Sequence, residues 1–397
     1  MDIPTIMRGV ARFARLAGVL LLGTAAAVAA EDDAVEAGRA ILIDAQNGTV
    51  LYAKAPDATF APGNAAKLMT LAVVFAGIDH NYAADETLYR VSEHAWRRGG
   101  APSRNTTMFL QLNSDVAVGD LLRGVATVQA NDASIALAEG FAGSEENFTQ
   151  QMNALAAEIG LRDTRFVNAT GLPAPGQATT VRDIARLVRH LVMQHGERYP
   201  LFNEAEITWS GIRQVNKNPY RTALPGVDGL ATAFSDDGGH ISIVSAVRDG
   251  RRLIGVLADL PSPEARDRAT RDLMNLGFTG FVERQLFDSG ETVTTARVFG
   301  GATSHVALVT PGPVRVALPR DSDGRITARV VYTGPLTAPV RKGAIVARLL
   351  IRRDGVAVHD LPLEAGDDVA EGGLVRRATD GVRELAVSTV LSLIPGF

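Results

Sequence analysis

The sequence predicts an α+β domain with one antiparallel sheet, followed by a small all-β domain and a C-terminal amphipathic helix. In residues 31–288, strand-like runs occur at both ends with a helical block between them, which is typical of a sheet built from the two ends of one segment. From about Gly290, short alternating runs are separated by Pro-Gly, Asp-Gly and Thr-Gly turns. Residues 373–397 have a helical period with a basic side.

The first 30 residues have the features of a secretory signal peptide. A basic region with three arginines (Arg8, Arg12, Arg15) comes first. A short apolar run, Leu16–Ala30, follows it. Ala27-Val-Ala29 gives an A-x-A cleavage site just before Glu31. A retained membrane anchor is the alternative, and the short apolar run makes it the weaker of the two.

Composition excludes some classes of partner. The 397-residue chain is 46% hydrophobic and 21% charged, as in ordinary globular proteins. Its net charge is −4, and loss of residues 1–30 removes three arginines and one aspartate, leaving −6. This charge argues against a nucleic-acid partner. The chain has no cysteine, and its seven histidines are scattered without metal-ligand spacing, so we expect no disulfide, metal or cofactor.

The elements of the first domain, 31–288, follow from period and turn signals. A hairpin is predicted over 40–52 with Asn47-Gly48 as a two-residue turn, and strands 241–247 and 253–257 are joined through Asp249-Gly250. The helices are predicted from apolar periodicity and end signals at 64–77, 115–139 with a break near Asn131, 148–159, 181–195 after the N-cap Thr180, and 264–276.

The second domain is placed at 289–368. Its strands are predicted at 306–309, 314–318, 326–332 and 345–351, and a turn at 353–355 leads to a last strand at 356–363. The tail, 373–397, has too many polar residues to span a bilayer comfortably. We interpret it as a helix lying on a membrane surface, and a helix packed on its own domain is the alternative.

The stretch Ala61–Thr70 predicts a helix start with a chemical signature. Pro62 and Gly63 break the preceding structure, and Asn64 can serve as N-cap. Asn64 and Lys67 are one turn apart on one face, which is the spacing of S-x-x-K with asparagine at the nucleophile position. Taken alone, the stretch also fits an Asn-capped helix with a surface lysine.

Two further stretches complete a known set of motifs. Val128–Ala138 contains Gln129-Ala-Asn131, and Pro225–Ser235 contains Ala231-Thr-Ala233. With Asn64-x-x-Lys67 they follow the order S-x-x-K, S-x-N, K-T-G. The chain therefore resembles the serine D-alanyl-D-alanine carboxypeptidases, the low-molecular-mass penicillin-binding proteins. Other matching stretches are Ala40-Ile-Leu-Ile-Asp44, Gly211–Pro219 and Ala296–Gly301. The resemblance implies a β-lactamase/DD-peptidase-like domain over 31–288.

The resemblance also implies a chemistry from which this chain departs. In the family, the serine attacks a peptidoglycan stem peptide, the lysine takes its proton, and backbone N–H groups hold the oxyanion. Lys67 and Asn131 keep family positions, whereas an amide replaces the nucleophile at 64. The implied substrate-binding positions are Gln129, Thr232 and Arg266, and Arg266 fits a helix surface charge equally well. Because Ala231 replaces the motif lysine, we expect Lys67 to stay protonated and to be a poorer base.

Three functions are compatible with these residues. The first is an inactive family member in the periplasm, at the inner membrane, that binds stem peptides and takes β-lactams only non-covalently. The second is a residually active carboxypeptidase in which Lys67 steers water. The third is a membrane-tethered envelope adaptor. We favour the first, because Asn64 lacks the hydroxyl that an acyl-enzyme requires.

Overall fold

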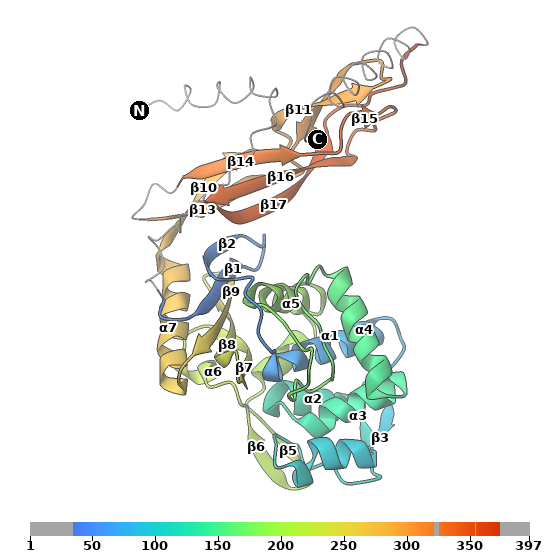
Figure 1. The fold of residues 1–397 in the computed structure, drawn as a ribbon, viewed down its shortest axis with the longest axis vertical. Helices are drawn as coiled ribbons and strands as arrows, with labels where there is room; N and C mark the ends of the chain where they lie inside the picture. Colours follow the sequence, from blue (N-terminus) through green and yellow to red (C-terminus); the bar gives the residue numbers. More distant parts are fainter. Residues whose placement is uncertain (1–34, 321–324, 354, 374–397) are drawn as a thin grey trace. The chain divides into compact units, whose positions relative to one another are not determined.

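The computed structural model describes residues 35–320, 325–353 and 355–373. Within these ranges the predicted fold class is confirmed: an α+β domain precedes an all-β region (Figure 1). None of the helices in these ranges is long and apolar enough to cross a membrane. The predicted signal peptide, 1–30, and nearly all of the predicted amphipathic helix, 373–397, lie outside the described residues.

The first domain is built on a five-stranded antiparallel sheet in the order β2-β1-β9-β8-β7. As predicted, its strands come from the two ends of the domain: β1 Arg39–Asp44, β2 Val50–Lys54, β7 Val227–Ser235, β8 Gly239–Arg248 and β9 Arg251–Leu260. Asp249 and Gly250 join β8 to β9 with positive φ at both positions, as a tight hairpin requires.

The predicted two-residue turn at Asn47-Gly48 is wrong in length. Five residues, 45–49, connect β1 to β2. The Asn47 side chain accepts a hydrogen bond from the Thr49 N–H at 2.9 Å, and the Gly48 N–H donates to the Asp44 carbonyl at 2.9 Å. The local hydrogen bonds of the asparagine side chain therefore stabilise a wider turn.

Helices cover both faces of the sheet, one long helix on one face and a block of five on the other. Helix α7, Pro263–Thr279, packs on one face through a cluster that includes Leu42, Leu257 and Met274. Helices α1 Ala66–Asp79, α2 Val118–Val128, α3 Asn131–Ala142, α4 Glu145–Glu158 and α5 Val181–Gln194 form the helical block. Thr180 caps α5 as predicted, with its Oγ1 accepting the Asp183 N–H.

Helix α1 lies inside the helical block (Figure 1). Most of its residues are buried, since it contacts each of the helices α2 to α5. A helix that is apolar on all sides has to be enclosed by other elements. Helix α1, which begins two residues after Asn64, is therefore the centre of this domain, and the turn before it lies against strand β7.

Short elements complete the domain. The two-stranded pairs are β3 Leu88–Arg90 with β4 Asp115–Ala117, and β5 Glu206–Trp209 with β6 Ile212–Val215. The single turns of helix are η2 Gly63–Ala65, η3 Ala95–Gly99, η4 Ala101–Ser103, η5 Tyr199–Asn203 and α6 Tyr220–Ala223.

The second region is entirely β. Strand β10, Phe281–Phe287, follows α7 and pairs with β13, Val314–Pro319. Six more strands form a sheet in the order β14-β16-β17-β12-β11-β15. They are β11 Thr292–Phe299, β12 His305–Val309, β14 Ile326–Val331, β15 Leu336–Thr337, β16 Ile345–Arg353 and β17 Val356–Ala365. Strand β16, the second in this order, alternates between buried and more exposed residues, which is the period that the sequence predicted.

Candidate active site

The turn before α1 sets the position of Asn64. Asn64 lies in η2 and is not the N-cap, because Ala65 has that place. The N-cap prediction is therefore wrong, and the Asn64 side chain makes tertiary contacts instead. Gly63 has φ +51°, and a Cβ there would come within 2.4 Å of the Phe234 carbonyl oxygen. Glycine therefore allows η2 to lie directly against strand β7.

Lys67 is a buried lysine, so the interpretation as a surface lysine is wrong. Only 2% of the residue is exposed. Its Nζ donates to the Asn64 Oδ1 at 2.7 Å and to the Thr170 carbonyl oxygen at 2.6 Å. A neutral amine has two hydrogens, so these two acceptors satisfy the uncharged form and leave its lone pair available.

Burial acts against the expectation that Lys67 stays protonated. Burial lowers the pKa of Lys67 from its ordinary value of 10.5 to about 7. Desolvation disfavours the ammonium form, whereas the absence of a lysine at position 231 has the opposite effect on the Lys67 pKa. Lys67 is therefore able to act as a proton acceptor near neutral pH, although residue 64 has no hydroxyl proton to give.

Gln129 joins the same hydrogen-bonded group. It ends α2 with φ +58°, and its Oε1 accepts from the Asn64 Nδ2 at 3.0 Å. Asn131 begins α3 two residues later, and its N–H donates to the Thr106 carbonyl. Among the described residues, the buried Gln129 Nε2 and Asn131 Oδ1 have no hydrogen-bond partner. The site thus holds one unsatisfied donor and one unsatisfied acceptor.

Residues of the third motif lie on strand β7. Ala231 and Ala233 are buried in the core cluster of the helical block. Thr232 points to the opposite face of the strand and is paired in register with Ser242 on β8. Ala231, at the position of the motif lysine, therefore faces the helical block to which α1 belongs.

Arg266 lies in the first turn of α7, away from the hydrogen-bonded group around Asn64. Its Nε donates to the Tyr220 hydroxyl at 2.9 Å, and its guanidinium is 3.0 Å from the Asp267 carboxylate. The Tyr220 hydroxyl donates to the same carboxylate. The Arg266 side chain is 13% exposed, so its charge is largely held by these two neighbours.

Sequence reasoning did not identify Thr170, whose carbonyl holds Lys67. The carbonyl belongs to the turn 168–172, in which the Asn168 Oδ1 accepts from the Thr170 and Gly171 N–H groups at 3.2 and 2.7 Å. The pattern Asn-x-x-Gly indicates such a turn. Nothing local, however, indicates that this turn meets a helix about 100 residues earlier in the chain.

The chemistry available at this centre is that of two amides and one amine. A carboxamide at 64 has no ionisable hydroxyl and cannot form the ester intermediate of a serine enzyme. Within residues 35–320, 325–353 and 355–373, no three His, Asp or Glu side chains are grouped as around a metal ion. In this polar centre, Asn64 and Lys67 stand at the serine and lysine positions of the first motif, and Gln129 stands at the serine position of the second.

Residues 26–262 match the family model described as D-alanyl-D-alanine carboxypeptidase. The chain belongs to the D-alanyl-D-alanine carboxypeptidase family. Residues 281–371 match the model of the penicillin-binding protein 5 C-terminal domain. The D-alanyl-D-alanine carboxypeptidase DacC of Escherichia coli is 33% identical over 355 residues, which cover 89% of this chain and 89% of that protein. The resemblance inferred from the motifs is therefore confirmed.

Solved structures in the carboxypeptidase family agree with this fold. Penicillin-binding protein 5 of Haemophilus influenzae is similar with a TM-score of 0.70 at 29% identity, covering 85% of this chain and 98% of that one. Penicillin-binding protein D2 of Listeria monocytogenes, in its ampicillin-bound form, is similar with a TM-score of 0.53 at 27% identity, over 62% of this chain and 98% of that chain. The family processes peptidoglycan and binds its stem peptides and β-lactams.

Proposed function

We propose that this carboxypeptidase-family protein binds D-alanine-terminated peptidoglycan stem peptides without hydrolysing them. The observation that carries the proposal is the Asn64 side chain, which occupies the nucleophile position and is hydrogen-bonded to both Lys67 and Gln129. An amide fixed at both ends fills the place from which a serine hydroxyl would attack.

The unsatisfied polar atoms of the site support binding of a peptide. A peptide group offers one acceptor and one donor. Both unsatisfied atoms are buried, so a peptide reaches them only when the site opens; the Gln129 Nε2 then donates to the peptide carbonyl and the Asn131 Oδ1 accepts from the peptide N–H. Buried groups without partners are costly, so a ligand that satisfies both gains affinity from them.

The loss of rate expected without a nucleophile argues against useful hydrolysis. In subtilisin, loss of the nucleophile alone lowers kcat by about 2 × 10⁶, and roughly 10³–10⁴ over water remains from the oxyanion hole and binding. Here the second-motif serine and the third-motif lysine are also replaced, by Gln129 and Ala231. Lys67 remains a base with a pKa of about 7. Hydrolysis by water that Lys67 activates directly is therefore the competing function that the experiment has to exclude.

The test is calorimetric titration of the mature protein with a stem pentapeptide ending in D-Ala-D-Ala, with free D-alanine assayed in the same samples. We expect saturable binding, no D-alanine, and about tenfold weaker binding in Asn131→Ala, the loss of about one hydrogen bond. Gln46→Ala, on the exposed β1–β2 turn, is the control. The same peptide ending in L-Ala-L-Ala should bind less.

Two outcomes contradict the proposal. Release of D-alanine that disappears in Lys67→Ala would identify an active carboxypeptidase. Absence of binding by a folded protein would leave the adaptor function, in which only the outer surface is used.

The proposal places the protein in the periplasm against the inner membrane, where stem peptides occur. It rests on the signal-peptide features of residues 1–30 and the basic amphipathic period of 373–397. Cell fractionation checks this placement. We expect the full-length protein in the membrane fraction and a variant lacking 374–397 in the soluble periplasmic fraction, and a cytoplasmic protein would contradict it.

A further inference from the structure

The Lys67 amine depends on a turn that is anchored from several sides. The turn 168–172 presents the Thr170 carbonyl to Nζ at 2.6 Å. The preceding carbonyl, of Ala169, accepts from the Thr70 Oγ1 of α1 at 2.7 Å. A Cβ on Gly171 would come within 1.7 Å of the Gly63 carbonyl oxygen, so the turn also packs tightly on η2. Movement of this turn would therefore displace an acceptor of Lys67.

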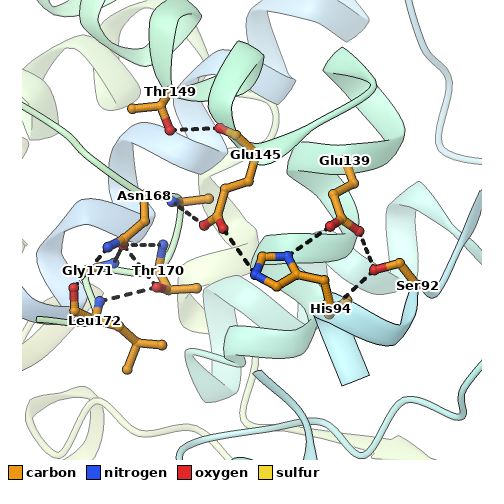
Figure 2. A network of polar contacts seen from close by, with 11 residues as sticks. Ser92, His94, Glu139, Glu145, Thr149, Asn168, Thr170, Gly171 and Leu172 are labelled. Atoms are coloured by element: carbon orange, nitrogen blue, oxygen red, sulfur yellow. Dashed lines mark hydrogen bonds and ion pairs between the residues drawn. The ribbon is translucent and has the colours of Figure 1, made fainter. Parts of the chain in front are cut away.

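One anchor of the turn is a carboxylate from another helix. Glu145, the first residue of α4, accepts the Ala169 N–H on its Oε1 at 2.9 Å. Ala169 is fully buried, and the Glu145 side chain is only 18% exposed. Figure 2 shows this carboxylate between the turn and His94. Glu145 therefore connects the turn that holds Lys67 to a second set of charged groups.

His94 lies between two carboxylates. Its Nδ1 is 2.9 Å from the Glu139 Oε1 of α3, and its Nε2 is 3.9 Å from the Glu145 Oε2 of α4 (Figure 2). Glu139 also accepts from the Ser92 Oγ at 2.5 Å. The hydrogen bond of His94 is the one to Glu139, and at 3.9 Å its contact with Glu145 is an ion pair that exists only with a protonated ring. On the same segment as His94, Glu93 is paired with Arg97 instead.

We propose that Glu145 is a positioning residue for Lys67, acting through the turn 168–172, and that His94 supports Glu145. Without the carboxylate, the Ala169 N–H loses its buried acceptor, and water enters to satisfy it. The Thr170 carbonyl then holds Nζ less closely, and the Lys67 ammonium becomes better solvated. The inference concerns the same site as the proposed function, but it requires neither peptide binding nor hydrolysis.

The pKa of Lys67 is the measurable quantity. The chain has only four lysines (Lys54, Lys67, Lys217, Lys342), so the protein labelled with ¹³Cε-lysine gives a simple spectrum, and Lys67→Met identifies the signal. Titration by NMR compares the unaltered protein with Glu145→Ala, Glu145→Gln and His94→Gln. Glu146→Gln is the matched control, since it removes a carboxylate from the neighbouring position of the same helix turn.

We expect the Lys67 pKa in Glu145→Ala to lie at least about one pH unit above that in Glu146→Gln. Glu145→Gln keeps an acceptor for the Ala169 N–H, so it and His94→Gln should give smaller increases. Thermal melts verify that each variant is folded. If Glu145→Ala does not fold, the comparison uses Glu145→Ser, whose shorter side chain does not reach the Ala169 N–H, with Glu146→Gln as its control. Equal Lys67 pKa values in the folded variant and the control overturn the inference whatever the absolute value, and peptide binding by the same samples reports separately on the proposed function.

Discussion

Asn64→Ser is expected to acquire a covalent penicilloyl adduct with ampicillin, whereas the unaltered protein gains no mass. The serine hydroxyl would stand next to Lys67, whose Nζ is now 2.7 Å from the Asn64 side chain. With a pKa of about 7, Lys67 can take the hydroxyl proton while Oγ opens the β-lactam C–N bond and forms an ester. We expect acylation to rise by at least about 10³-fold, less than the 10⁶ that a nucleophile is worth in subtilisin, because Gln129 and Ala231 remain.

Intact mass spectrometry and peptide mapping measure this result. Asn64→Ala is the matched control, since it opens the same space without supplying a nucleophile. An adduct on the unaltered protein would show that another residue acylates and would contradict the role given to Asn64. A folded Asn64→Ser protein without adduct would mean that the changes at Gln129 and Ala231 to Ala233 have also abolished acylation.

Lys67 is expected to make folding stability rise between pH 7 and pH 9. Burial lowers its pKa from 10.5 to about 7 in the folded protein. Between these two values the unfolded chain binds a proton that the folded protein does not, so the free energy of unfolding increases with pH. From pH 7 to 9 the gain should be about 2 kcal/mol relative to a variant without the amine.

Urea unfolding of the unaltered protein and of Lys67→Met at both pH values checks this expectation. The window avoids His190 and His359, whose pKa values are lowered by burial, and Tyr199, whose pKa is raised by burial. The variant reports the background from all other groups. Equal pH dependence in the two proteins would mean that Lys67 stays charged in the folded state.

Local patterns in the sequence were sufficient for the architecture and for the family. Asp249-Gly250 and the apolar runs on either side predicted β8 and β9, because a two-residue turn and a period of two depend only on neighbouring residues. The order of motifs from Asn64 to Thr232 indicated the family in the same way. The replacement of the nucleophile is likewise visible in the sequence, because it is a change of residue type at a known spacing.

The tertiary structure decided what those residues do. Asn64 looked like a helix cap, but its side chain bonds to Gln129, 65 residues away, because η2 lies against α2 and β7. Lys67 looked exposed and charged, but the enclosure of α1 buries it, and the Thr170 carbonyl, 103 residues later, becomes its partner. Burial and long-range hydrogen bonds depend on how distant segments pack. No local pattern encodes them, and it is they that set the pKa of Lys67 and orient the amide at position 64.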